Sequence, residues 1–361
     1  MKIPLLSSNQ KDGSKTIILL NDFKAQWAEI RDSALSAFDR VGRSGWLILG
    51  EEVASFECEL ARFWGIPFCV GCASGLDAIE ISLRCLGAKP GDKVLTTPLS
   101  AFATTLAIVR AGCVPLFVDV DQSGLIDLDE CEEMLKQDQK IRFLVPVHLF
   151  GHALDLKRLS KIGEDNNVVI IEDCAQAIGA KSNGAVVGSA SGAAPTSFYP
   201  TKNLGCMGDG GAILTQNPDT ASLARKLRDY GQSAKYRHSF LGLNSRLDEI
   251  QAAIMKDALL PLLSAHTERR RMIAESYIKG IFNQAITLPP IPKGSESVWH
   301  LFPVLVREER ESFQKYLSKA GIATGNHYPI LIPDQPAMAC FQNSKNKKEF
   351  RNAKRFAEEE V

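Results

Sequence analysis

Three short apolar runs decide the fold: Lys93-Val94-Leu95-Thr96, Pro115-Leu116-Phe117-Val118 and Phe143-Leu144-Val145-Pro146-Val147. Further runs at 68–71 and 168–171 extend the series in both directions. The segments between the runs repeat apolar residues at helical spacing. Helices are therefore expected at residues 76–86, 103–110, 127–135 and 156–163. Strands alternating with helices predict an α/β fold with a mostly parallel sheet and helices on both of its faces.

The regions on either side of this alternation suggest two domains. Residues 14–65 are predicted to be mainly helical, and residues 245–260 form a helix that leads toward a second domain. Later residues contain fewer strand-like runs, among them Leu301–Val306. We predict a large domain over residues 1–250 and a smaller C-terminal α+β domain over residues 251–361.

The composition excludes several classes of protein. The 361 residues carry 42 basic and 42 acidic side chains, and a net charge of zero disfavours non-specific nucleic-acid binding. No apolar run approaches the roughly 18 residues that cross a membrane, and residues 1–6 lack the apolar core of a signal peptide. The Cys69–Cys72 pair has no second CxxC pair to complete a zinc site. We expect a soluble cytoplasmic protein with no metal centre and no membrane or nucleic-acid partner.

The first candidate binding segment is Cys72-Ala73-Ser74-Gly75, which follows the strand-like run at 68–71. Ligands of open parallel sheets bind beyond the carboxyl ends of the strands. Small residues before a helix let backbone N–H groups approach an anion, and the helix N-terminus favours negative charge. Ser74 is thus either part of a phosphate cup, which we define as Ala73–Gly75, or a simple helix cap.

Two further segments are predicted at the same edge of the sheet. Asp173 follows the run at 168–171, where it could cap a helix or pair with a protonated ring nitrogen. Lys202 lies among hydroxyl and turn residues, just before the glycine-rich turn at 208–211. A lysine desolvated in a cleft has a lowered pKa and can form a Schiff base.

These parts together match the needs of pyridoxal 5′-phosphate (PLP). An acid keeps the pyridine ring charged so that the ring can act as an electron sink, and a lysine carries the cofactor covalently. An N–H-rich cup with neighbouring hydroxyl groups binds the phosphate.

The order of these motifs resembles the DegT/DnrJ/StrS sugar aminotransferases, which are fold type I PLP enzymes. The resemblance rests on Ala73–Gly75, Glu172–Ala177 and Ser197–Gly205, and it extends from near residue 16 to the end of the chain. Supporting segments are Ser44–Trp46, Pro146–Gly151, Gly242–Glu249 and Asn326–Pro329.

The resemblance implies a role for each matching residue. Lys202 would attach the cofactor and move protons, Asp173 would bind the pyridine nitrogen, and Gln176 would reach the ring hydroxyl. Asn244 would reach the phosphate in the neighbouring subunit, which implies a homodimer; its alternative role is that of a turn residue. The residues implied to hold the phosphate are Ser74, Gly75 and Ser197.

Three departures from the family pattern are visible. The aromatic that stacks on the pyridine ring is replaced by Ala101 in a gapless match, and Phe102 falls one position later. Leu76 stands where a threonine is common beside the phosphate. The chain stops at Val361, where family members continue with a further strand and helix, so we expect an incomplete small domain.

The predicted function is PLP-dependent transfer of an amino group from glutamate or glutamine to a nucleotide-linked keto-sugar, in two half-reactions. A lysine at 202 disfavours the dehydratase branch, which has a histidine there. The alternatives are amino transfer to a cyclitol ketone and a catalytically idle PLP-binding regulatory protein. Candidates for contact with the substrate, each of which could instead be purely structural, are Trp46, His327 and Tyr328, with Tyr236 and His238 further possibilities.

Overall fold

The computed structural model describes residues 17–307, 309–341 and 349–361. The α-helices are α1 (Phe23–Ser44), α2 (Glu51–Trp64), α3 (Gly75–Cys85), α4 (Phe102–Arg110), α5 (Leu128–Gln137), α6 (Leu156–Asn166), α7 (Pro218–Leu227), α8 (Glu249–Ile254), α9 (Leu263–Gly280), α10 (Arg310–Lys319) and α11 (Arg351–Glu359). The strands are β1 (Phe68–Cys72), β2 (Lys93–Thr96), β3 (Val114–Phe117), β4 (Ile141–Val145), β5 (Val169–Ile170), β6 (Lys181–Ser182), β7 (Ala185–Val186), β8 (Ala194–Ser197), β9 (Gly211–Thr215), β10 (Gln232–Ala234), β11 (Arg237–His238), β12 (Ile286–Thr287), β13 (Ser295–Glu296) and β14 (Leu305–Val306).

A central sheet carries the candidate site. Strands β3, β2, β4 and β5 pair in that order and run parallel, as the sequence predicts. Backbone bonds from Glu172 N–H to Ala193 O (3.1 Å) and from Cys174 N–H to Pro195 O (2.9 Å) join the chain after β5 to β8. Strand β9 then pairs antiparallel with both β8 and β1. The carboxyl ends of β1, β8 and β5 therefore face the same edge of the sheet.

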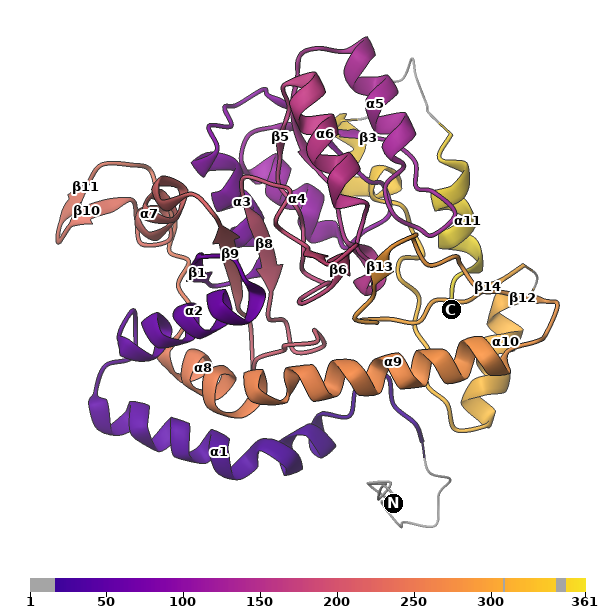
Figure 1. Ribbon diagram of the computed structural model, residues 1–361, viewed down its shortest axis with the longest axis horizontal. Helices are drawn as coiled ribbons and strands as arrows, with labels where there is room; N and C mark the ends of the chain where they lie inside the picture. Colours follow the sequence, from indigo (N-terminus) through magenta and orange to yellow (C-terminus); the bar gives the residue numbers. More distant parts are fainter. Residues whose placement is uncertain (1–16, 308, 342–348) are drawn as a thin grey trace.

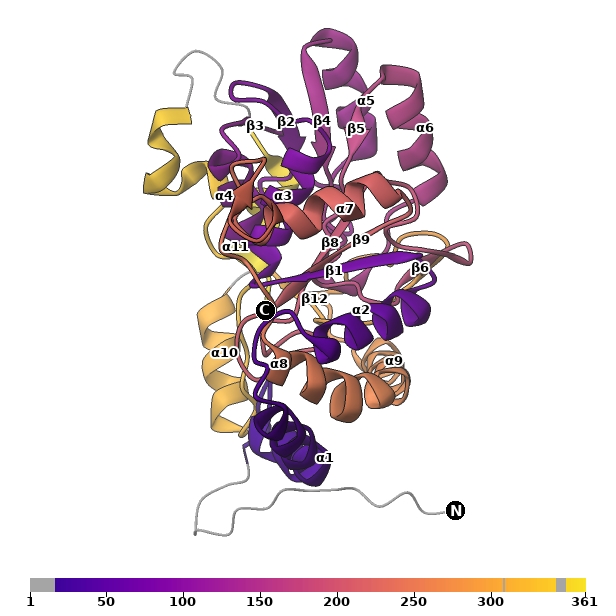
Figure 2. The same ribbon diagram turned by 90° about the vertical axis from the view of Figure 1, so that its left-hand side faces the viewer.

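Helices cover both faces of the sheet, which confirms the predicted layers (Figures 1 and 2). On one face, α3 and α7 pack against inward side chains such as Val70 and Ile213. On the other face, α1, α2 and α8 pack against neighbouring residues such as Cys69 and Leu214. Successive strand residues point to opposite faces, so each central strand needs apolar residues throughout.

The predicted helix over residues 245–260 begins later than the sequence suggests. Residues 245–247 are not helical, and Asp248 is extended and forms an antiparallel bridge with Ile48 before α8 starts at Glu249. A five-residue π-helical segment, Met255–Leu259, and a 3-10 turn, Leu260–Leu262, then lead into α9. The predicted boundary at 250/251 falls inside α8, and the division into two domains stays a prediction.

The C-terminal part of the chain returns to the sheet. Strand β14 is shorter than the apolar run at 301–306, because Pro303 has no N–H to donate. The rings of Phe356 in α11 and Phe150 stack at 6.1 Å, and both side chains are buried. Asp119 Oδ2 and Oδ1 accept the N–H groups of Asn352 (2.9 Å) and Ala353 (2.8 Å), in the first turn of α11. Among the described residues, every helix is too short or too polar to cross a membrane.

We predict that Asp119→Ala lowers the free energy of unfolding by about 1–3 kcal/mol, because two N–H groups at the start of α11 lose their acceptor. Urea unfolding of the full chain would measure the loss. Asp32→Ala is the matched control, since the Asp32 side chain is 95% exposed. Similar stabilities for the two variants would contradict this role of Asp119.

Candidate active site

The loops after β1, β5 and β8 converge at one edge of the sheet. The sequence-predicted cup follows β1, Asp173 follows β5 and Lys202 follows β8. The hydrogen bonds between the chain after β5 and β8 place the last two loops side by side. Segments far apart in the sequence are thus brought together by strand order.

The cup is assembled by close backbone packing. Ser74 is the N-cap of α3, and its hydroxyl accepts the N–H of Asp77 at 3.1 Å. A serine hydroxyl that accepts one hydrogen bond can still donate its own proton, so capping and phosphate binding are compatible. A Cβ atom at Gly75 would lie 2.6 Å from Ser197 Cβ, and one at Gly211 would lie 2.4 Å from backbone atoms of Ser74. Only glycine permits this approach, which places Ser74, Gly75 and Ser197 next to one another. Their role in holding a phosphate stays a prediction.

Asp173 is a buried carboxylate, 3% exposed. Its Oδ2 accepts the hydroxyl of Thr104 at 2.9 Å, and its Oδ1 accepts the N–H of Ala175 at 3.0 Å. A parallel bridge to Val147 holds its backbone. Burial raises the pKa of Asp173, whereas the two hydrogen bonds and the nearby charge of Lys202 lower it. The ionised form of Asp173 therefore depends on these two donors and on the charge of Lys202.

Lys202 lies in a tight loop behind β8. Its N–H bonds to Tyr199 O at 2.8 Å, and a Cβ at Gly205 would lie 2.2 Å from Pro200 O, so the turn needs glycine there. Burial lowers the pKa of Lys202 to about 8, and the charge of Asp173 partly opposes this shift. A larger fraction of this amine is consequently neutral and nucleophilic near neutral pH than of an ordinary lysine.

Gln176, His327 and Tyr328 form one side of the site. Gln176 Oε1 accepts the N–H of Phe150 at 2.7 Å, and its Nε2 donates to the Tyr328 hydroxyl at 3.2 Å. Burial raises the pKa of Tyr328 to about 12, so its hydroxyl keeps its proton. Burial and the charge of Lys202 lower the pKa of His327.

The remaining candidate residues are more exposed than Asp173. Phe102 is the first residue of α4, half-buried and two positions before Thr104. Asn244 is exposed in the single chain, and its backbone forms a bridge with Asp229. Tyr236 is 85% exposed and the neighbouring His238 is exposed as well, both in the β10–β11 region.

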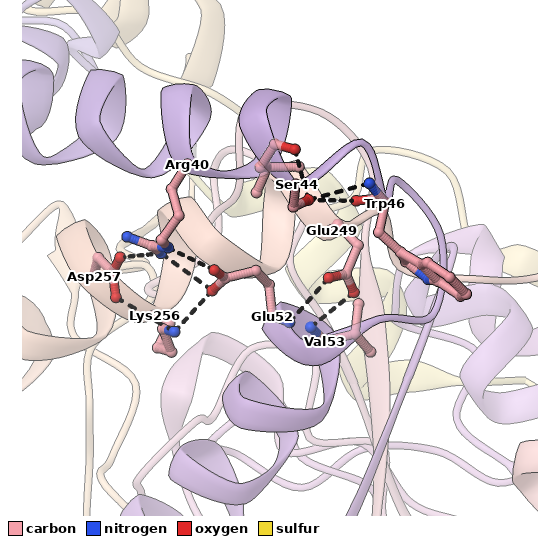
Figure 3. Close-up of polar contacts among 9 residues, drawn as sticks. Arg40, Ser44, Trp46, Glu52, Val53, Glu249, Lys256 and Asp257 are labelled. Carbon is pink, nitrogen blue, oxygen red and sulfur yellow. Dashed lines mark hydrogen bonds and ion pairs between the residues drawn. The ribbon is translucent and has the colours of Figure 1, made fainter.

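Trp46 lies in the loop between α1 and α2 and is 63% exposed (Figure 3). Its indole N–H donates to Ile48 O at 2.7 Å. The loop is anchored by Glu249, whose carboxylate accepts the N–H groups of Gly50 (2.8 Å) and Val53 (2.9 Å) at the start of α2. Figure 3 also shows a separate set of ion pairs, which ties α1 to α2 and to the π-helical segment and is formed by Arg40, Glu52, Lys256 and Asp257.

Sequence reasoning missed three residues of this region. Thr104 supports Asp173. Its sequence signals are its i,i+4 spacing from Ser100 and its place at the end of the stretch 100–104, where the family pattern also has a threonine. Ser245 accepts the N–H of Ala73 in the cup at 3.1 Å, a contact between residues far apart in the sequence. Glu360 Oε2 accepts the N–H of His327 at 2.6 Å, and burial raises the pKa of Glu360 to about 7.

A second buried layer lies directly behind Asp173. His148 Nε2 and Glu172 Oε2 are 2.8 Å apart, and the other ring nitrogen of His148 accepts the N–H of Leu154 at 3.2 Å. Glu172 also accepts the N–H groups of Gly188 and Ala190. Cys174 Sγ lies close to both side chains, in an arrangement that resembles a metal site. The polar groups of the pair are already hydrogen-bonded within the protein, which favours a structural role.

These residues fit PLP. The buried Asp173 carboxylate suits a protonated ring nitrogen, and the partly neutral Lys202 suits covalent attachment. The glycine-lined cup at the N-terminus of α3 suits a phosphate group.

We predict that Lys202 titrates near pH 8, well below the ordinary lysine value of 10.5, because burial disfavours its ammonium form. Asp173→Asn should lower this pKa further, since the neighbouring carboxylate favours the charged amine. Reductive methylation of the PLP-free protein at a series of pH values, read by peptide mass spectrometry, would measure both pKa values. An unchanged Lys202 profile in the Asp173→Asn variant would contradict the coupling.

Known proteins are similar to this chain in sequence and in fold. The profile of the DegT/DnrJ/EryC1/StrS aminotransferase family matches residues 28–361. A dTDP-3-amino-3,6-dideoxy-alpha-D-galactopyranose transaminase of Aneurinibacillus thermoaerophilus is 42% identical over 85% of this chain and 84% of its own length. A protein of Geobacillus stearothermophilus named pleiotropic regulatory protein is 38% identical over 88% of this chain and 86% of its own length.

A solved structure confirms the predicted architecture. DesV of Streptomyces venezuelae, in complex with a ketimine intermediate, superposes with a TM-score of 0.91 at 36% identity. The match covers 96% of this chain and 92% of DesV. The chain belongs to the DegT/DnrJ/EryC1/StrS aminotransferase family, the PLP-dependent sugar aminotransferases.

Proposed function

We propose that this PLP-dependent sugar aminotransferase takes an amino group from glutamate or glutamine and gives it to C3 of a nucleotide-linked keto-sugar. The donor leaves as a keto acid, and the acceptor's C=O becomes an amine. The observation that carries the proposal is the partly neutral Lys202 beside the buried Asp173. The sugar class and the carbon follow the name of the Aneurinibacillus relative, which describes a 3-amino sugar on dTDP.

The residues of the site divide the work. Bound PLP supplies an electron sink and carries the amino group between the two substrates. Lys202 Nζ, with a pKa of about 8, can give and accept a proton near neutral pH, as a general acid–base group must. Asp173 stabilises positive charge on the ring, and Ser74, Gly75 and Ser197 hold the phosphate at the N-terminus of α3. The hydrogen bond from Gln176 to the Tyr328 hydroxyl holds these two side chains in position at the site.

We predict that Lys202→Ala abolishes amino transfer while the protein remains folded, because no other group in the proposed scheme shuttles the proton. The wild-type protein, ¹⁵N-glutamate and a panel of nucleotide 3-keto- and 4-keto-sugars would be incubated and read by mass spectrometry. Wild type should transfer the label to a 3-keto-sugar, and glutamine would be compared as the donor. Turnover by Lys202→Ala at the wild-type rate would refute the assignment.

We further propose that the active protein is a homodimer in which Asn244 serves the partner's site. Support comes from exposed apolar side chains near this segment, among them Leu241 at 92% and Tyr236 at 85% exposure. The β10–β11 hairpin also projects from the body of the single chain (Figure 1). A free monomer would leave this apolar surface in water.

A mixed dimer tests this arrangement directly. Lys202→Ala and Asn244→Ala should each be inactive alone, but co-refolding them should restore activity, because one site per mixed dimer then has both residues intact. Light scattering would confirm the dimer. If Asn244 acts within its own chain, neither site of the mixed dimer is complete and activity should stay absent.

A PLP-binding regulatory protein is the second candidate, and the name of the Geobacillus relative favours it. The absorbance spectrum separates the two. Wild-type protein loaded with PLP should lose its visible band when glutamate or glutamine is added. A spectrum unchanged by every amino donor would favour the regulatory role.

A further inference from the structure

Two hydroxyl groups form a buried chain behind Asp173. Ser100 Oγ and Thr104 Oγ1 are 3.1 Å apart, and Thr104 Oγ1 donates to Asp173 Oδ2 at 2.9 Å. The exposed fractions of Ser100, Thr104 and Asp173 are 4%, 2% and 3%. Thr104 lies in the first turn of α4, whereas Asp173 follows β5, so the contact is tertiary.

The direction of the hydrogen bonds follows from proton counting. An ionised carboxylate only accepts, and a threonine hydroxyl has a single proton to donate. Thr104 gives that proton to Asp173, so its oxygen accepts the proton of Ser100. The two hydroxyls therefore point their dipoles in series toward the carboxylate, which strengthens the last hydrogen bond.

We propose that Thr104 is a positioning residue, which orients the Asp173 carboxylate and keeps it ionised so that it can hold the protonated ring nitrogen of PLP. The inference rests on the proposed function, because it assigns Asp173 to that nitrogen. Burial alone favours the neutral acid, which cannot form an ion pair with the ring. Thr104 supplies a side-chain donor where water is excluded.

The charges around Asp173 do not by themselves offset the effect of burial on its pKa, so a hydrogen-bond donor is needed as well. Burial is the largest effect and raises the Asp173 pKa, whereas the charge of Lys202 lowers it. His148 accepts the N–H of Leu154 at one ring nitrogen and contacts Glu172 with the other. The other titratable groups facing it are Tyr328 and Cys174. Burial raises the pKa of both, so neither carries charge near neutral pH.

Four variants test the role of the Thr104 hydroxyl. Thr104→Val removes it and keeps the shape of the side chain, while Thr104→Ser keeps it. Thr105→Val is the matched control: Thr105 is the next residue of α4 and is fully buried, and within the described structure its hydroxyl has no hydrogen-bond partner. Ser100→Ala tests the outer member of the chain.

The readout is the affinity of the full-length apo-protein for PLP, titrated by absorbance across a range of pH. Thr104→Val should bind roughly tenfold or more weakly, because a hydrogen bond to a charged group is lost. As the pH is lowered, the affinity of Thr104→Val for PLP should begin to fall at a higher pH than that of wild type, because loss of the donor raises the Asp173 pKa. Thr104→Ser should restore both, and Ser100→Ala should shift the acid side in the same direction by less.

The controls separate the possible failures. If Thr104→Val and Thr105→Val bind PLP equally at every pH, Thr104 has no positioning role. If Thr104→Val does not fold, Ser100→Ala is used instead. A Ser100→Ala protein whose PLP affinity falls at the same acidic pH as that of wild type would overturn the inference. Failure of wild type to transfer an amino group, with PLP binding intact and the Thr104 effects present, would count against the proposed function alone.

Discussion

The buried carboxylate of Asp173 is the constraint on which the site depends. Removing a carboxylate from water costs free energy unless hydrogen bonds and nearby cations compensate for the lost hydration. Here Thr104 and Ala175 donate hydrogen bonds to its two oxygens, and Lys202 contributes positive charge. The same burial makes the carboxylate effective, because its attraction for a charged ring is weakly screened inside the protein.

Sheet topology delivers the other groups to this carboxylate. Strand β9 runs antiparallel between β8 and β1, so β1 keeps the direction of the parallel strands. The cup at the end of β1 therefore faces the same edge as Asp173 and Lys202. Gly211 at the start of β9 lets its backbone pass close to Ser74 without a clash.

The C-terminal part of the chain completes the site from outside the sheet. Glu360 accepts the N–H of His327, and Tyr328 bonds to Gln176, which itself receives the N–H of Phe150. Packing of α11 against Phe150 and the bonds from Asp119 keep this region in place. The histidine and tyrosine near Lys202 are thus tied both to the sheet and to the last residues of the chain.

The sequence by itself determined the alternation of strands and helices and the parallel core, and it singled out Lys202, Asp173 and the cup as candidate site residues. Those features are local: apolar periodicity marks the elements, and each motif directly follows a strand. The pairing of β1 with β9, the late start of α8 at Glu249 and the support of Asp173 by Thr104 were decided only by tertiary structure. They depend on contacts between residues far apart in the chain, where hydrogen-bond partners are chosen by packing and strand order, which short-range periodicity does not encode.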